Sequence, residues 1–514
     1  MPYRFGCEGE LTAGRGLREG VVATVVGLVV AVVAFLRIPA ADLGVVWAED
    51  GAVFLTQRLA EGPFATWFSP YDGYLHLVPR ILADLVVAVL PLEWFGVGIG
   101  VGTCLVAGGV GAFVFVASRD VVAALPGRFG LPARCVLAGL VVIVPTVSFE
   151  VLGNAANLHW LLLWLAPWLV LIRPRTRAAG MLVGVLALAV GLSEIQAAVV
   201  LPFAVLPFLL LRWRERAGLP VRAALVLAFA VQLVTTLLSD RAARPPVLPD
   251  VLSTVLGFAV NAVLMPFLGQ FHAANLVLAT GGWVVAAALA LLAGALALVL
   301  VRGGRERAIA AGVLAWSAVV LWTAGFVLNP NPAFFYAQFG REQWEALGPL
   351  RYGVVPAMCV LAIVVLAITV LLAPASAPAR PRPPAPGGES RPSVVIRGVT
   401  AGMGTLRRDS EASGEGGGEG PEGAGRGGRM LRASRIAGAV LGAAVAAGAA
   451  ALIAWQLVGT AGSSIRTSGP EWTDTVRTGE TACEAPDAPE EVALPVHPPT
   501  WSATVACTLL TPTP

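Results

Sequence analysis

The sequence predicts an all-α polytopic membrane protein, and three observations lead to this fold class. Of the 514 residues, 57% are hydrophobic and 13% are charged, whereas soluble domains have about 45–50% apolar and about 25% charged residues. Many apolar runs approach the length of about 20 residues that a helix needs to cross a bilayer. The net charge is only +3, with the charges dispersed, so we expect no nucleic-acid partner.

Arginine-rich segments predict the orientation, because loops rich in basic residues stay in the cytoplasm. Such segments occur within residues 1–19, around 173–177, 212–216 and 302–307, and after residue 374. We therefore expect the N-terminus inside a cytoplasmic membrane, the C-terminus outside, and about eleven crossings between them. The expected crossings are 20–36, 95–117, 131–149, 158–172, 178–193, 195–211, 222–239, 276–301, 308–328, 351–373 and 436–458.

Two further apolar stretches, 75–91 and 251–268, would break the alternation of sides if they crossed fully. We expect both to form interfacial or re-entrant helices. The first carries His76, Arg80 and Asp84, and such polarity suits a juxtamembrane helix better than one that faces lipid.

The helices expected at 178–193 and 195–211 are short for a bilayer. About 16 residues span roughly 24 Å, against about 30 Å of hydrocarbon. The tip between them carries Glu194. Below the outer surface, its carboxylate would need a polar cavity or a partner. Alternatively, local thinning of the membrane leaves Glu194 in water.

The composition changes abruptly after the bundle at 20–373. Residues 374–435 are rich in Ala, Pro, Gly, Arg and Glu, and we expect a disordered cytoplasmic linker. The helix at 436–458 consists largely of small residues, which allow close packing against other helices.

Residues 459–514 are expected to form a small extracytoplasmic tail. Of the six cysteines, only Cys483 and Cys507 are expected in an oxidising compartment. We predict a disulfide between them, because so short a segment has too small a core to fold without a cross-link. Two independent thiols are the alternative.

Polar residues gather on the expected external side. Glu49 and Asp50 are adjacent after the first helix. A carboxylate pair can accept a proton, bind a divalent cation or hold a cationic group, although a solvated loop or an acidic helix start is the alternative. Three further clusters on this side contain Tyr74, His76 and Arg80, then Glu150, Asn154, Asn157 and His159, and finally Arg351 and Tyr352. Each cluster alone is typical of interfacial sequence, and their convergence favours a functional site.

This arrangement resembles the GT-C superfamily of integral-membrane glycosyltransferases, which use polyprenyl-phosphate-linked sugars. Residues 47–51 (WAEDG) are similar to the acidic motif of the family's first external loop. Residues 150–159 stand where many members have a second polar motif, and the Arg-Tyr pair at 351–352 resembles a late family element. The family's usual order is Asp then Glu, whereas here Glu49 precedes Asp50, so either is a candidate base.

The resemblance implies a GT-C-like bundle over 20–373 that transfers sugar to a glycan, glycolipid or protein acceptor at the outer membrane face. Such transfer needs a base, a phosphate site and polar groups around the sugar. Asp50 or Glu49 would be the base, and Arg351 or Arg80 would bind the phosphate. Further substrate-binding candidates are Tyr74, His76, Glu150, Asn154, Asn157, His159, Glu194 and Tyr352, with Trp160 or Trp47 as stacking partners. A divalent metal ion is an open possibility as cofactor.

Two other function classes compete with this hypothesis. A transporter or flippase would place charges within the membrane on broken helices, and Glu194 fits that description. A scaffold that binds partners through its tail would not need the acidic pair. The sequence has no phosphate-binding glycine loop, paired CxxC or HExxH motif, so we do not expect a Walker-type ATPase or a zinc protease.

Overall fold

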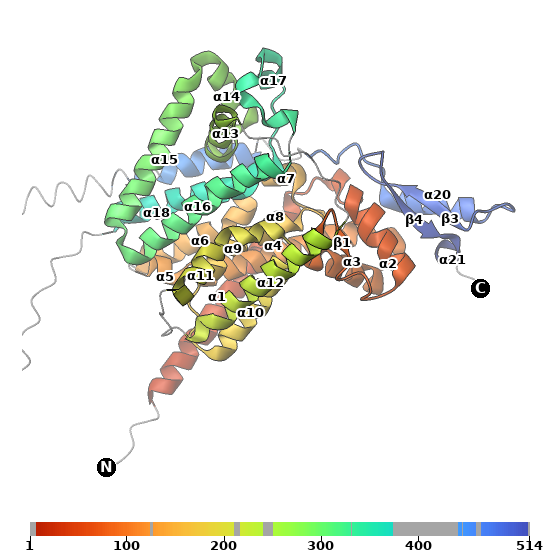
Figure 1. Cartoon of the computed structure of the whole chain (residues 1–514), viewed down its shortest axis with the longest axis horizontal. Coiled ribbons are helices and arrows are strands. Elements are labelled where there is room, and N and C mark those ends of the chain that lie inside the picture. The colour runs from red at the N-terminus through yellow and green to blue at the C-terminus, as the bar shows by residue number, and fades with distance from the viewer. Residues whose placement is uncertain are drawn as a thin grey trace, which may run out of the picture.

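Helices make up most of the structure, a computed structural model that describes residues 7–123, 127–209, 216–239, 250–329, 331–373, 440–458 except 441 and 445, and 464–511 (Figure 1). The expected linker at 374–435 lies outside the described residues. The long helices are α1 (Cys7–Leu36), α4 (Phe95–Ala117), α12 (Leu219–Leu238), α14 (Met265–Thr280), α15 (Gly282–Arg302), α16 (Gly304–Leu328) and α18 (Val354–Leu372).

Shorter elements connect the long helices. Helix α6 (Gly127–Ile143), with 17 residues, is one residue longer than α14 and belongs with the long helices. The shorter α-helices are α2 (Thr56–Glu61), α3 (Leu77–Val89), α5 (Arg119–Val122), α7 (Val147–Glu150), α8 (Leu158–Leu163), α9 (Leu165–Leu171), α10 (Arg177–Gly191), α11 (Leu201–Leu209), α13 (Val251–Phe258), α17 (Arg341–Glu345), α20 (Trp472–Cys483) and α21 (Cys507–Leu510). The 3-10 and π turns are η1 (Ala40–Asp42), η2 (Asp50–Leu55), η3 (Leu92–Trp94), η4 (Ile195–Val200), η5 (Arg216–Gly218), η6 (Ala259–Leu264), η7 (Pro332–Phe334), η8 (Tyr336–Gln338) and η9 (Arg351–Gly353). The strands are β1 (Pro70–Tyr71), β2 (Tyr74–Leu75), β3 (Glu491–Pro495) and β4 (Ser502–Ala506).

Seven segments of the described chain are long and apolar enough to cross a membrane. They are Leu17–Leu36, Leu92–Ala117, Leu219–Leu238, Val251–Thr280, Gly282–Arg302, Gly304–Leu328 and Arg351–Leu372. Five of the expected crossings correspond to shorter apolar helices at Phe129–Ile143, Leu158–Leu171, Arg177–Gly191, Ile195–Leu206 and Gly442–Val458. The chain therefore has the character of a multi-pass helical membrane protein.

The region 251–301 differs from the expectation of a re-entrant helix followed by one crossing. Val251–Thr280 is a single apolar segment of 30 residues, long enough to span a membrane. Gly269 lies inside it with a φ of 73°, a left-handed conformation that favours glycine. Gly281 has a φ of 61° and ends the segment, so the next helix begins at Gly282 rather than at residue 276. The expectation missed this break because both sides of it are apolar.

Close helix packing joins α1 to α4 at the core of the bundle. A Cβ atom on Gly108 would lie 2.6 Å from the backbone oxygen of Gly27, so neither helix tolerates a larger residue there. Small residues let helix backbones approach closely, which is how apolar helices gain packing contacts in lipid. This contact holds the middle of α1 against α4, and α1 ends at Leu36, before the polar segment that begins at Trp47.

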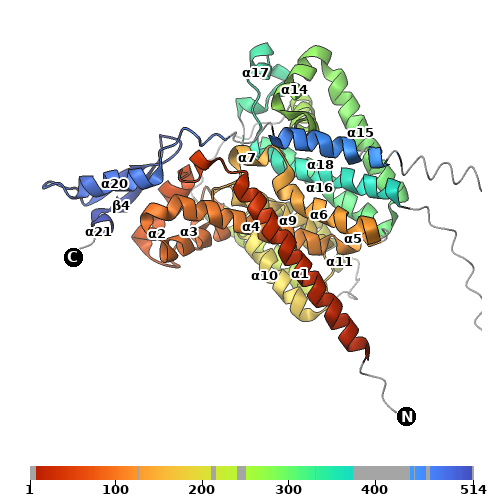
Figure 2. The same cartoon turned by 180° about the vertical axis from the view of Figure 1, so that it is seen from behind.

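The described part of the tail is a small folded unit. Its strands β3 and β4 form an antiparallel pair, and α20 packs against them with Trp472 and Val476 buried. The predicted disulfide between Cys483 and Cys507 is confirmed. Figures 1 and 2 both show the tail at the end of the molecule where α2 and α3 lie, away from the turn between α15 and α16.

Removing the disulfide is expected to loosen the tail selectively. The bridge closes a loop with a sequence separation of 24 residues, for which loop-closure entropy gives about 3.5 kcal/mol. We expect Cys483→Ser combined with Cys507→Ser to speed proteolytic cleavage within residues 464–511. The matched control is Cys135→Ser, which changes an exposed free thiol. Equal cleavage rates in both variants would contradict a stabilising role for the bridge.

Candidate functional site

A polar cavity of about 420 Å³ lies where the segment around Glu49, the β1–β2 hairpin, the connections after α7, α10 and α16, the turn before α18 and the tail meet. Most of its exposed lining is polar, and acidic, basic, amide and aromatic side chains all contribute. Its lining residues are Glu49, Phe54, Tyr71, Asp72, Tyr74, His76, Ala156, Asn157, His159, Trp160, Glu194, Ile195, Gln196, Leu328, Asn329, Asn331, Phe334, Arg351, Tyr352 and Trp501.

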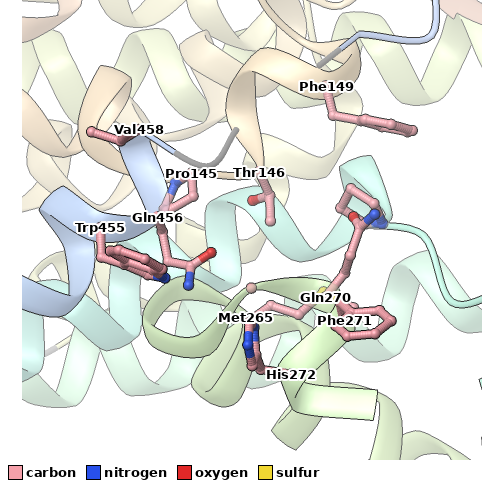
Figure 3. Close-up of a pocket in the computed structure, with 12 residues that line it drawn as sticks. Pro145, Thr146, Phe149, Met265, Gln270, Phe271, His272, Trp455, Gln456 and Val458 are labelled. Carbon is pink, nitrogen blue, oxygen red and sulfur yellow. The ribbon is translucent and has the colours of Figure 1, made fainter. Parts of the chain in front are cut away.

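A second cavity, of about 360 Å³, lies between α14 and the helix that carries Trp455 (Figure 3). Its lining is mainly apolar and contains no acidic side chain, and His272 is its single titratable residue. Acid–base chemistry on a substrate requires groups that exchange protons. We therefore place the candidate site in the polar cavity.

The two adjacent carboxylates point in different directions. Asp50 is 1% exposed; its Oδ2 accepts a hydrogen bond from Ala155 N at 2.9 Å and its Oδ1 accepts one from Ala156 N at 2.7 Å. Glu49 instead lines the cavity, and its Oε2 has no hydrogen-bond partner among the described residues. Asp50 thus supports the 153–157 loop, while Glu49 is the member of the pair that lines the cavity, with its Oε2 atom itself buried.

The buried Asp50 is expected to make stability depend on pH. Burial raises the pKa of its carboxyl from 3.8 to about 7, against the opposing hydrogen bonds from Ala155 and Ala156. A pKa raised by folding means that the folded state loses stability, relative to the unfolded chain, as pH rises through this interval. The melting temperature of the wild type minus that of Asp50→Asn should therefore fall between pH 3.8 and about 7 and stay level above. An unchanging difference from pH 4 to 8 would contradict this assignment.

His159 and Glu194 form a dyad in the wall of the cavity. The Nδ1 of His159 is hydrogen-bonded to Oε2 of Glu194, and Oε1 of Glu194 accepts from Gln196 N at 2.7 Å. A carboxylate at Nδ1 favours the tautomer with the proton on that atom, which leaves Nε2 as an acceptor. Glu194 is 1% exposed. Both of its buried carboxylate oxygens have a hydrogen-bond partner, one in the backbone of its own turn and the other in His159.

The β1–β2 hairpin supplies aromatic rings to the cavity. Asp72 and Gly73, with φ angles of 48° and 86°, form its two-residue turn, as expected for an Asp-Gly pair in a hairpin. Tyr74 stacks near His76 with ring centroids 4.1 Å apart. Burial lowers the pKa of His76 to about 3, so His76 is a neutral packed ring at physiological pH.

Arg351 is the arginine that lines the cavity. Its Nη1 donates to Oε1 of Glu150 at 2.5 Å, and the remaining N–H groups of the planar fork suit a phosphate. Arg80 does not line the cavity: it is 1% exposed, donates to Oε1 of Gln57 at 2.7 Å and lies over the ring of Phe54.

The structure therefore gathers most of the candidates from the sequence into one cavity. Those that line it are Glu49, Tyr74, His76, Asn157, His159, Glu194, Arg351 and Tyr352, together with Trp160. Those outside it are Asp50, Arg80, Glu150 and Asn154. Asn154 stabilises the loop, since its Oδ1 accepts from Asn157 N at 2.8 Å and its Nδ2 donates to Glu150 O at 2.7 Å.

Sequence reasoning missed several polar and aromatic lining residues. They include Gln196, Asn329, Asn331, Phe334 and Trp501. The Asp-Gly turn signal could have identified the hairpin, whereas nothing local to Trp501 indicates that it approaches Glu49. Within the described ranges, no group of three or more His, Cys, Asp or Glu side chains could hold a metal ion.

No protein family, curated protein or solved structure matches this chain. The features of the cavity itself are therefore the basis for inferring a function. That cavity combines a carboxylate with one unpartnered oxygen, a carboxylate–imidazole dyad, a guanidinium and several aromatic rings, which together can bind a polar substrate and move a proton.

Proposed function

We propose that the chain is a membrane glycosyltransferase that moves a sugar from a polyprenyl-phosphate donor to a glycan, glycolipid or protein acceptor on the outer face of the cytoplasmic membrane. The proposal includes a GT-C-like bundle of about eleven crossings, with the shorter apolar helices among them, the N-terminus inside and the C-terminus outside. The multi-pass helical character supports access to a lipid-linked donor.

One observation carries the proposal: the Glu49 carboxylate, with Oε2 unpartnered, lines the same cavity as the Arg351 guanidinium. In the proposed reaction, the acceptor oxygen attacks the anomeric carbon while the bond from that carbon to the phosphate oxygen breaks. The acceptor proton passes to Glu49, and the leaving oxygen keeps the electron pair. Arg351 stabilises the phosphate through paired N–H groups.

Aromatic and amide side chains around these two groups fit a sugar. Trp160 and Tyr74 offer ring faces, while Asn157 and His159 offer hydrogen-bonding groups. Binding sites for small polar molecules combine apolar surfaces with a few placed polar groups. This composition supports a carbohydrate substrate.

The test is transfer of radiolabelled sugar in membranes that contain the wild type or the Glu49→Gln variant at matched expression. A panel of polyprenyl-phosphate sugars serves as donors, and membranes without the protein give the background. Incorporation above background that is lost in the variant supports the proposal. Incorporation that is equal in the two would overturn the assigned mechanism.

A transporter or flippase is the second candidate, and the burial of Glu194 next to the short helix α10 favours it. A carboxylate and an imidazole in contact can carry a proton across a membrane. Reconstituted vesicles loaded with a fluorescent polyprenyl phosphate separate the two functions. Movement between leaflets without any sugar transfer would favour the transporter.

A further inference from the structure

The most unexpected wall of the polar cavity comes from the tail. Trp501 lies in the connection between β3 and β4 and lines the cavity together with Glu49. More than 400 residues separate the two in the sequence. The site of the bundle is therefore closed by a side chain that the disulfide-bonded tail contributes.

The tail holds this position through contacts with the segment that leads into Glu49. His497 N donates to Val46 O at 3.0 Å, and the rings of His497 and Trp47 lie 5.9 Å apart. Thr504 N donates to Oγ1 of Thr56 at 2.9 Å. These bonds lie on both sides of Trp501, so they hold the turn that carries Trp501 beside the segment that contains Glu49.

The Trp501 side chain is half-buried: it packs against the apolar cluster that includes Trp472, Leu494 and Val505, and it also lines the cavity. The backbone of Trp501 closes the local turn: its N donates to Pro498 O at 3.0 Å, and its O accepts from Val496 N at 3.1 Å. Both are backbone hydrogen bonds, so shortening the Trp501 side chain removes neither of them. The half-buried indole is thus available to a ligand in the cavity.

We propose that Trp501 is the platform on which a pyranose ring of the acceptor stacks; this inference rests on the proposed function. Pyranoses carry faces of C–H groups, and a tryptophan ring offers a large flat apolar surface with a polar N–H edge. The amides Asn329 and Asn331 line the same cavity and suit ring hydroxyls. The proposed acceptor is therefore a pyranose-containing glycan or glycolipid.

The place of Trp501 assigns it to the acceptor rather than to the donor. Arg351, the proposed phosphate partner, is the first residue of the segment Arg351–Leu372, which is long enough to span a membrane. Trp501 belongs to the tail, which contains no such segment within its described residues. A lipid-linked donor enters from the membrane helices, so the tail lines the side open to the acceptor.

The test is saturation-transfer NMR on the full-length protein in lipid nanodiscs. The probes are methyl β-glycosides of glucose, galactose and mannose, and glycoside detergents are removed because they would compete. We expect the wild type to saturate the ring protons of at least one probe. Trp501→Ala should reduce that signal about tenfold, and Trp501→Phe should retain part of it because a ring face remains.

Thr500→Ala is the matched control, since Thr500 is the exposed neighbour in the same connection and should bind like the wild type. The platform is overturned if Trp501→Ala binds like Thr500→Ala, or if the wild type binds none of the probes. In the transfer assay, Trp501→Ala should raise the acceptor KM about tenfold and leave the donor KM within twofold. If glycoside binding depends on Trp501 but no sugar transfer occurs, the role of Trp501 as a stacking platform would stand and the proposed glycosyltransferase function would be rejected.

Discussion

Replacing Glu49 with glutamine is expected to lower sugar transfer by a factor of about 100 to 10,000, the range typical of a lost general base. Glutamine keeps the size of the side chain but cannot accept a proton from the acceptor hydroxyl. Since Oε2 of Glu49 has no partner among the described residues, the substitution breaks no bond of that atom. The measurement is the rate of label incorporation at saturating donor, with the melting temperature as a check on folding.

Two matched variants make the Glu49 result specific. Glu61→Gln removes an exposed carboxylate at the end of α2, and we expect normal transfer. Asp50→Asn is expected to act through the 153–157 loop, with the pH-dependent change in melting temperature described above. Full transfer in Glu49→Gln together with loss only in Asp50→Asn would reverse the two roles.

Replacing Arg466 with methionine is expected to cost about 3–5 kcal/mol of stability, as for a buried charge that loses its partner. Arg466 is 2% exposed and donates to Gly153 O at 2.8 Å and to Leu152 O at 2.9 Å. It also lies 3.9 Å from the buried carboxylate of Asp42. Without it, two carbonyl groups and that carboxylate lose their cationic partner, so the 153–157 loop and the tail should separate more readily.

Thermal unfolding in nanodiscs and proteolysis of the tail measure this effect. Arg477→Met is the control because Arg477 belongs to the same tail and its side chain is 68% exposed. Surface ion pairs contribute little, so this variant should melt like the wild type. Similar melting temperatures for Arg466→Met and Arg477→Met would contradict the expectation that Arg466 holds the tail to the 153–157 loop.

The sequence predicted the membrane character and the disulfide well, because both follow from composition and local pattern. Apolar runs reveal helices of spanning length, and Cys483 and Cys507 were the two cysteines expected outside. The break at Gly281 was missed because one glycine within apolar sequence does not disturb the hydropathy pattern. Local signals thus identify elements better than they identify the ends of those elements.

The sequence predicted which residues belong to the candidate site better than it predicted how those residues are arranged. Adjacent residues such as Glu49 and Asp50 look equivalent in a sequence, and only the backbone at the start of η2 separates their directions. Arg80 and Arg351 were likewise indistinguishable until burial placed the first away from the cavity. The position of Trp501 beside Glu49 could not be predicted from the sequence, because it depends on how the whole tail docks on the bundle.

The docking of the tail on the loop at 153–157 also has a consequence for biogenesis. Residues 464–511 follow all seven segments of spanning length found in the described part of the chain, so the ribosome makes Arg466 and Trp501 only after those segments have been synthesised. During synthesis, the bundle therefore contains Glu49, Glu194 and Arg351 before the part of the cavity wall that Trp501 contributes has been made. The order of synthesis thus delays completion of the cavity until the tail has emerged, been oxidised and docked.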